Sequence, residues 1–414
     1  MAHYDLVVVG GGAAGFYGAI QAGEIMPGAK ILILEKTNKL LSKVRVSGGG
    51  RCNVTHSCFN PIALSHHYPR GEKSLRAVFK HYNASHTVEW FEKKGVLLKT
   101  EEDGRMFPNT DSSETIINCF LTEARLLGIT IATGDGVDAI IPGEARLDIK
   151  MQSGKIYTSK QVLIATGGSP NRNAYRFIEA LGHTIVLPIP SLFTFNDGGK
   201  KLIDLMGVAV PGAEVRIVGT KFRQTGPILI THWGLSGPAI IKLSAWAAGH
   251  LHALNYTFTA LVSWIGPAKE EDLRTQLLGN KTVRAKQKIC KHALFGLPQR
   301  LWERLCALAE IEETRIWSEV SQRHVNRLLE NLIKCPFQIK GKTTFKEEFV
   351  TCGGVDLNEV DMTTMESRKI NGLFFAGEVL NIDGETGGYN FQSAWSTACL
   401  AARSAFGIAS HNPK

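Results

Sequence analysis

The sequence predicts an α/β fold in which a parallel sheet binds a dinucleotide at the carboxyl ends of its strands. Residues 6–9 form a continuous apolar run, which is typical of a strand buried on both faces. Gly10, Gly12 and Gly15 follow at the G-x-G-x-x-G spacing, and a second apolar run occupies residues 31–34. The order of strand, glycine turn, helix and strand indicates a Rossmann-like unit.

The glycines of this unit and the acid that follows it have distinct physical roles. Gly10 permits a tight turn, Gly12 lets the backbone approach a pyrophosphate, and Gly15 lets the helix pack on the strand. The helix expected over residues 13–22 directs its N-terminal N–H groups at the phosphate. Glu35, twenty residues after Gly15, is placed to accept the hydroxyls of an adenosine ribose. A glycine-rich turn without a ligand is the alternative, and the combined pattern favours the dinucleotide site.

Length and composition predict a globular protein of two to three domains. The chain has 414 residues, 44% of them hydrophobic, and eight cysteines. The sequence shows no signal peptide and no apolar run near the ~18 residues that span a bilayer, which predicts a soluble, cytoplasmic protein without a membrane partner. The cysteines form no C-x-x-C pair and no zinc-type cluster with histidine, so we expect reduced thiols and no metal site.

The positive charge of the chain is unevenly distributed. The net charge is +9, and sixteen Lys or Arg face nine Asp or Glu between Lys269 and Lys346. A solvated helical surface explains this excess without any partner. A surface that meets a polyanion such as RNA is the alternative.

Further glycine-rich segments are expected at the same crevice. Residues 47–53, SGGGRCN, combine three glycines with polar donors, and the buried strand expected over residues 161–166 leads into two more glycines. A short strand over residues 373–376 precedes Gly377 and Glu378, and a helix of small residues starts near residue 389. Ligands collect at the carboxyl ends of parallel strands. Because so many strand ends and helix N-termini converge, FAD suits the crevice better than a nicotinamide dinucleotide.

Changes in sequence pattern predict the domain organisation. A single helix is expected over residues 75–94, and from Pro188 short alternating runs between glycines and prolines predict a small antiparallel barrel. The fold class is therefore a Rossmann-like split FAD-binding domain, of the glutathione-reductase-like class, with an inserted β-barrel plus helical domain. The predicted segments are the first part of the FAD-binding domain (1–188), the β-rich insertion (189–268), the inserted helical domain (269–335), the return through the insertion (336–350) and the second part of the FAD-binding domain (351–414).

Motifs spread in order over nearly the whole chain resemble one family. They are GGGAAG (10–15), SGGGRCN (47–53), GRMFP (104–108), ATGG (165–168), THWGLSGPA (231–239), TCGGV (351–355), TMES (364–367) and GLFFAGEVLNIDGETGGYNFQ (372–392). The chain resembles the bacterial NAD(P)/FAD-dependent oxidoreductases of the aminoacetone-oxidase type, which include a 3-dehydro-bile-acid delta-4,6-reductase. The resemblance implies that the segments around Arg51, Gly168, Glu378 and Tyr389 surround the flavin. The chain departs from the family pattern at Asn381, usually Asp, and in its short segment after Gly168.

The candidate site residues come from all of these segments. Three residues are candidates for catalysis or substrate orientation: Arg51, His232 and Tyr389, with a loop-fixing, structural or stacking role as the alternative for each. Cys52 has no partner cysteine, and we expect an inert thiol. The candidate cofactor-binding residues are Gly10, Gly12, Ala13, Ala14, Gly15, Glu35, Lys36, Ser47, Gly48, Gly49, Gly50, Arg51, Asn53, Val137, Thr166, Gly167, Gly168, Gly377, Glu378, Gly387, Gly388, Tyr389, Asn390 and Phe391.

The sequence thus predicts an FAD-dependent oxidoreductase that acts on a small organic substrate through a non-covalent flavin, by amine or aminoketone oxidation or by enone reduction. The chain shows a single dinucleotide fingerprint, so either NAD(P)H docks transiently as electron donor or the substrate itself reduces the flavin. Two alternatives remain open. One is an RNA-modifying flavoprotein that uses the basic inserted segment, and the other is a flavin-binding protein without turnover.

Overall fold

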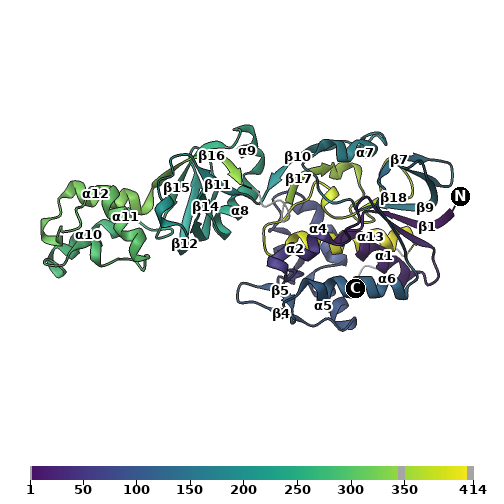
Figure 1. Ribbon diagram of the computed structural model, residues 1–414, viewed down its shortest axis with the longest axis horizontal. Helices are drawn as coiled ribbons and strands as arrows, with labels where there is room; N and C mark the ends of the chain where they lie inside the picture. Colours follow the sequence, from purple (N-terminus) through teal and green to yellow (C-terminus); the bar gives the residue numbers. More distant parts are fainter. Residues whose placement is uncertain (1, 344–349, 408–414) are drawn as a thin grey trace. The chain divides into compact units, whose positions relative to one another are not determined.

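The computed structural model describes residues 2–343 and 350–407 (Figure 1). The chain forms two compact units, a first unit of Met1–Ser191 with Lys346–Lys414, and an inserted unit of Leu192–Phe345. Each unit has its own hydrophobic core, so each is described by itself. Residues 344–349 and 408–414 lie outside the described residues, and with them part of the predicted return segment and of the second FAD-binding part.

A largely parallel sheet organises the first unit. Its strands lie in the order β6-β2-β1-β9-β8-β7, with β18 also paired to β9. The bounds are β1 (Ala2–Val9), β2 (Ile31–Glu35), β6 (Thr130–Thr133), β7 (Val137–Pro142), β8 (Leu147–Met151), β9 (Ile156–Ile164) and β18 (Leu373–Phe375). The register pairs Val9 with Leu34 and with Ile164, and Ile164 with Phe375. The carboxyl ends of four parallel strands therefore meet at one edge of the sheet.

Helices and small sheets surround this sheet. The helices are α1 (Ala13–Ile25), α2 (Ser42–Gly50), α3 (Pro61–Ser65), α4 (Glu72–His81), α5 (Ala84–Lys93), α6 (Ser113–Leu126), α7 (Arg176–Glu179) and α13 (Tyr389–Ala405), with the short 3-10 helices η1 (Arg172–Tyr175), η5 (Leu357–Glu359) and η6 (Gly377–Val379). The small sheets are β3 (Thr55–His56), β5 (Arg105–Pro108) and β4 (Leu98–Thr100), and β10 (Ile185–Ser191) with β17 (Val350–Val355).

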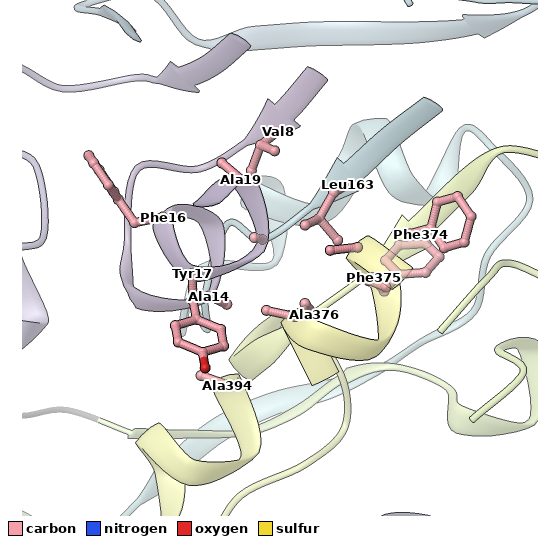
Figure 2. Close-up of a cluster of buried hydrophobic side chains, with 14 of the residues drawn as sticks. Val8, Ala14, Phe16, Tyr17, Ala19, Leu163, Phe374, Phe375, Ala376 and Ala394 are labelled. Atoms are coloured by element: carbon pink, nitrogen blue, oxygen red, sulfur yellow. The ribbon is translucent and has the colours of Figure 1, made fainter. Parts of the chain in front are cut away.

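The core of the first unit joins α1 to the sheet and to α13. Figure 2 shows Val8 of β1 and Leu163 of β9 beside side chains of α1 and β18. Gly18 of α1 allows the close approach, because a β-carbon there would lie 2.6 Å from Leu163 Cδ2 and 3.5 Å from Ala398 Cβ of α13. The helix that begins at the glycine turn is thereby held between β9 and α13.

The single helix predicted over residues 75–94 is wrong, because the structure has two helices, α4 and α5. Asn83 separates them by capping α5. Its side-chain oxygen accepts the N–H of Ser85 (3.0 Å), and its own N–H donates to His86 Nδ1 (3.1 Å). A side chain that offers the backbone these bonds favours a new helix start over continuation of the old one.

The inserted unit combines a closed barrel with helices, which confirms the predicted fold class. The barrel order is β11-β14-β13-β12-β15-β16. The strands are β11 (Thr194–Asp197), β12 (Ala209–Ile217), β13 (Arg223–Ile230), β14 (Gly234–Ser236), β15 (Thr257–Ser263) and β16 (Cys335–Thr343); the helices are α8 (Pro238–Trp246), α9 (Ala248–Ala253), α10 (Glu270–Val283), α11 (Gln299–Leu308) and α12 (Gln322–Ile333), with η2 (Ile203–Leu205), η3 (Ile289–Lys291) and η4 (Trp317–Glu319). In neither unit does a described helix have the length and apolar character needed to cross a membrane.

A carboxylate at the end of η5 should make the stability of the first unit sensitive to acid. Glu359 accepts the Thr184 N–H (2.8 Å), the Thr184 hydroxyl (2.8 Å) and Lys369 Nζ (2.7 Å). Burial opposes its ionisation, but these donors outweigh burial and lower the pKa of Glu359 to about 2. Because this value lies below that of an unfolded glutamate, the stabilisation is complete above about pH 5 and is lost as the pH falls toward 2.

We therefore expect Glu359→Gln to lower the urea midpoint at pH 6.5, and the difference from the natural protein to shrink at pH 3.5, where the unfolded chain binds a proton at Glu359 that the folded chain does not. Urea unfolding followed by circular dichroism at several pH values measures the effect. Exposed Glu144 provides the control, since Glu144→Gln should change the midpoint little at any pH. A gap between Glu359→Gln and the natural protein that stays constant with pH would contradict the assigned pKa.

Candidate dinucleotide site

Three strands of the first unit continue into glycines at the edge where they end. Gly10 follows β1, Gly377 follows β18, and Gly167 lies three residues after β9. Their φ angles are 117°, 74° and 71°, which place them in the left-handed region that favours glycine. The edge is therefore built from turns of backbone that only glycine adopts readily, rather than from side chains.

In the turn between β1 and α1, Gly10 and Gly15 are closely packed, whereas Gly12 has open space beside it. A β-carbon on Gly10 would lie 2.4 Å from the Ala165 carbonyl oxygen, and one on Gly15 would lie 1.9 Å from the Gly10 carbonyl oxygen. A β-carbon on Gly12 would meet nothing within 4 Å. Gly12 is the N-cap of α1, where no side chain caps the helix and no acidic residue lies in the first turn. The N–H groups of this turn are available to an anion that approaches Gly12.

Glu35 lies at the carboxyl end of β2, beside this turn. Its Oε2 accepts the Gly11 N–H (2.9 Å), and its Oε1 accepts the N–H and the hydroxyl of Thr37 (both 2.9 Å). A carboxylate offers about four acceptor positions, so a ribose hydroxyl can still be bound at Oε2. Thr133 pairs with Glu35, and Val137 begins β7 four residues later. Lys36 follows as an exposed side chain.

The SGGGRCN segment directly follows the helical part of α2, a helix that the sequence did not predict. Helical dihedral angles end before Ser47, although α2 is assigned through Gly50. Gly48, Gly49 and Gly50 then have φ angles of 60°, 69° and 86°, and all three are exposed. A β-carbon on Gly49 or Gly50 would meet nothing within 4 Å, whereas one on Gly48 would lie 2.9 Å from the Phe107 ring. The segment presents bare backbone, as expected of a peptide placed against a flat or charged group.

Glu378 joins three segments that are distant in the sequence. Its Oε1 accepts the Thr351 N–H (2.8 Å), and its Oε2 pairs with Lys43 Nζ (2.6 Å). A β-carbon on Gly168 would lie 2.6 Å from the same Oε1. Thr166, just before this glycine pair, is exposed. Lys43 and Thr351 were missed by sequence reasoning, because neither lies near Glu378 in the chain.

A second helix N-terminus without a side-chain cap belongs to the same unit. Gly388 is the N-cap of α13 with φ 90°, and α13 has neither a side-chain cap nor an acid in its first turn. Asn53 holds this turn, accepting the Gly388 N–H and donating to the Thr55 carbonyl (both 3.0 Å). The two helices meet at Gly377, where a β-carbon would lie 2.9 Å from Ala14 Cβ and 3.7 Å from Ala394 Cβ. Two uncapped positive dipole ends thus belong to one edge of one unit.

Comparison with known proteins identifies the family. Residues 4–404 match the model described as the HI0933-like protein Rossmann domain. The chain belongs to the HI0933-like family. It is 30% identical over 413 residues to the ribosomal RNA dihydrouridine synthase of Escherichia coli, covering 97% of this chain and 98% of that protein.

Two more known proteins are similar to this HI0933-like chain. The 3-dehydro-bile acid delta(4,6)-reductase of Clostridium scindens is 26% identical over 407 residues, covering 96% of this chain and 98% of that protein. This match confirms the family suggested by the motifs. The solved 3-ketosteroid delta1-dehydrogenase of Sterolibacterium denitrificans, in complex with 1,4-androstadiene-3,17-dione, shares the fold, with a TM-score of 0.51 at 12% identity over 98% of this chain and 99% of that chain.

Arg51 of the HI0933-like chain is held by the segment of residues 101–111, which includes β5. Its Nη1 lies 2.6 Å from Glu101 Oε1 and 3.5 Å from Asp111 Oδ1. The guanidinium carbon lies 4.0 Å from the centroid of the Phe107 ring, the ring that also contacts Gly48. These contacts favour the interpretation that Arg51 fixes the glycine segment, and its catalytic role stays a prediction.

Tyr389 and His232 differ in their surroundings. Tyr389 is buried, and its ring stacks on His67 (4.3 Å between centroids) and on His56 (4.9 Å). Burial raises its pKa, so the hydroxyl stays protonated at any physiological pH. His232 belongs to the inserted unit, between β13 and β14, with its ring centroid 4.2 Å from that of Trp233. Stacking is thus favoured for Tyr389, and catalysis by His232 stays a prediction.

Asn390 and Phe391 lie in the first turn of α13 and contact the residues around it. Asn390 accepts the Gly384 N–H (2.8 Å) and donates to the Gly384 carbonyl oxygen (3.0 Å), which closes the loop before the helix. Phe391 stacks on Trp395 at 5.5 Å between centroids. Gly387 has φ 130°.

Across the described ranges, no group of His, Cys, Asp and Glu has the geometry to hold a metal ion.

Cys52 should be an unreactive thiol in the folded protein. The residue is fully buried, and burial raises the pKa of its thiol to about 12. Since the thiolate is the nucleophile, we expect iodoacetamide at pH 8 to leave Cys52 unmodified until the protein is unfolded. Peptide mass spectrometry measures the modification of each cysteine, with partly exposed Cys58 as the comparison. Equal labelling of Cys52 and Cys58 in the native apo-protein would contradict this assignment.

Proposed function

We propose that the protein is an FAD-dependent reductase of a carbon–carbon double bond conjugated to a carbonyl group. The observation that carries the proposal is the shared edge with two uncapped helix N-termini. The N-terminus of α1 suits the pyrophosphate, and that of α13 suits the pyrimidine edge of the flavin, where negative charge collects on reduction. The residues present also fit FAD sterically, since β-carbons on Gly12, Gly49 and Gly167 would meet nothing within 4 Å.

The proposed chemistry divides between the cofactor and the chain. FAD, when bound, would supply a hydride equivalent to one carbon of the double bond, while a protein group or water must deliver a proton to the other. Gly12 and the first turn of α1 would bind the pyrophosphate, and Glu35 the ribose. Arg51 would hold the glycine segment over the ring. NAD(P)H is the proposed electron donor, docking transiently because the chain has a single dinucleotide fingerprint.

The relatives' names support this reaction class. Dihydrouridine is uridine with its C5–C6 double bond saturated, and that bond is conjugated to the C4 carbonyl. The bile acid delta(4,6)-reductase acts on a double bond conjugated to the 3-oxo group. Because the relative at 30% identity matches this chain from end to end, we propose uridine in ribosomal RNA as the substrate. A steroid-like dienone is the second candidate, favoured by the 26% relative. Amine oxidation is supported only by the resemblance of the sequence motifs to the aminoacetone-oxidase type.

One experiment separates these candidates. FAD-loaded protein is incubated anaerobically with NADPH or NADH and with either unmodified ribosomal RNA or a 3-oxo-4,6-dienoic bile acid. Nucleoside mass spectrometry measures dihydrouridine, and loss of dienone absorbance measures the steroid reaction. Dihydrouridine formation is the expected result, and dienone reduction alone would replace the RNA substrate. Reduction of neither, with peroxide released from amines in air, would overturn the reaction class.

A further inference from the structure

The net positive charge of the protein lies entirely in the inserted unit. Residues 192–345 contain 21 Lys or Arg against 12 Asp or Glu, a net charge of +9, which equals the net charge of the whole chain. The first unit, which holds the candidate dinucleotide site, is therefore neutral. A positive excess confined to one unit is the charge distribution expected of a surface that meets a polyanion, although a solvated helical surface has it as well.

Within the inserted unit, one segment concentrates unpaired cations. We call residues 281–292 the basic ridge, because they contain Lys281, Arg284, Lys286, Lys288 and Lys291 and no acid. Lys281 donates to the Val320 carbonyl oxygen and Lys291 lies 3.6 Å from Glu303, whereas the other three form no ion pair with any described residue. These three side chains are exposed or partly exposed.

Several other cations of the same unit are paired with an acid, whereas the basic ridge itself contains no acid. Arg274 and Lys334 contact Glu270, at 3.1 Å and 2.8 Å, and Arg327 pairs with Glu310. Cations at the C-terminus of α10 also interact favourably with the negative end of its helix dipole. This interaction explains the positions of Lys281 and Arg284 without any binding partner. Lys286 and Lys288 lie beyond the helix, where the dipole gives them no such role.

The backbone beneath these side chains is fixed. Gln287 donates to the Arg284 carbonyl oxygen (2.8 Å), and Ile289 donates to that of Arg315 (3.0 Å). Trp317 and Ser318 donate back to residues 287 and 285, at 3.1 Å and 3.0 Å. Ile289 and Trp317 below the turn are fully buried. A set of cations on a fixed backbone binds an anion without the cost of ordering the chain.

We propose that the basic ridge binds the phosphate backbone of the RNA substrate, through Arg284, Lys286 and Lys288. This inference rests on the proposed reduction of uridine in RNA. It identifies the surface that binds the RNA outside the reacting base. Phosphate contacts supply affinity and position but no sequence information. The basic ridge would therefore serve any RNA of suitable shape, and selection of the uridine would fall to the site that reduces it.

The test compares two triple variants of the full-length, FAD-loaded protein. Arg284→Gln/Lys286→Gln/Lys288→Gln removes the basic ridge cations. Lys73→Gln/Lys80→Gln/Arg125→Gln removes three exposed cations from the first unit, so the change in net charge is matched. Fluorescence anisotropy with a fluorescein-labelled, uridine-containing RNA hairpin gives the Kd at several KCl concentrations. FAD content and Tm of each variant confirm that it is folded.

We expect the ridge variant to bind the hairpin about tenfold or more weakly at 100 mM salt, with the slope of log K against log salt smaller by about two to three. The control variant should retain the affinity and slope of the natural protein. Equal behaviour of the ridge variant and the natural protein would overturn the proposal, and so would equal weakening by both variants. Ridge-dependent binding to phosphatidylglycerol vesicles but not to RNA would overturn it as well.

Dihydrouridine formation by the same proteins separates the two proposals. If the natural protein binds RNA through the basic ridge but forms no dihydrouridine, the docking surface stands and the proposed function fails. If dihydrouridine forms and the ridge variant makes it at the natural rate at sub-saturating RNA, the function stands and the docking surface fails.

Discussion

Gly12→Val should leave the protein folded but unable to hold FAD. The φ and ψ angles of Gly12 are −95° and −165°, an extended conformation open to any residue, and a β-carbon would meet nothing within 4 Å. The apo-protein should therefore lose about 0.5 kcal/mol or less of stability. Valine would nevertheless fill the space through which a pyrophosphate reaches the N-terminus of α1. We expect FAD to bind about 100-fold or more weakly, which corresponds to about 3 kcal/mol.

Gly15→Ala, in the same turn, should instead reduce the stability of the apo-protein. Its β-carbon would lie 1.9 Å from the Gly10 carbonyl oxygen, so the turn, and with it the packing of α1 on β1, has to move. We expect Gly15→Ala to lower the Tm of the apo-protein markedly, whereas Gly12→Val does not. Thermal unfolding of both apo-proteins and titration with FAD measure the two effects. Natural FAD affinity in Gly12→Val would show that the dinucleotide binds elsewhere, and unfolding of that variant would contradict the open space at Gly12.

The parts of the fold that depend on local sequence could be predicted. Strand burial and glycine spacing are written in consecutive residues, so the turn at Gly10 and the strand that ends before Gly377 were predicted correctly. The break at Asn83 was not predicted, because the apolar spacing of the flanking helices continues across it. A capping side chain competes with that periodicity, and its bonds are visible only in the structure.

Pairings between distant residues could not be predicted. Lys43 and Glu378 are 335 positions apart, and Arg70 and Asp383 are 313 apart. Sequence patterns indicate the secondary structure of each residue but not its distant partner, which depends on how the segments fold together. Asn381 illustrates the same point. Its Oδ1 is buried without a hydrogen-bond partner among the described residues, so a neutral amide is less costly there than a carboxylate would be.

Asp383→Ala should be the most destabilising of the substitutions considered for the first unit. Asp383 is fully buried in the segment that precedes α13, and its carboxylate accepts Nε of Arg70 (2.5 Å), a second guanidinium nitrogen and the Ser191 hydroxyl (2.8 Å). Burial raises the pKa of Asp383 even beside the guanidinium, which shows how strongly this environment disfavours a charge. Removing one partner of a buried ion pair costs about 3–5 kcal/mol, because the remaining charge loses its compensation.

The double variant Arg70→Met/Asp383→Leu tests that explanation directly. Replacing both charges by apolar side chains of similar volume is often nearly neutral, so the double variant should recover most of the stability that Asp383→Ala loses. Urea unfolding of the natural protein, Arg70→Met, Asp383→Ala and the double variant measures this recovery. A double variant no more stable than Asp383→Ala would mean that the hydrogen bonds to Ser191, rather than the loss of the ion pair with Arg70, determine the loss. Because α13 begins six residues after Asp383, FAD affinity should fall with stability in the single variants and recover in the double variant.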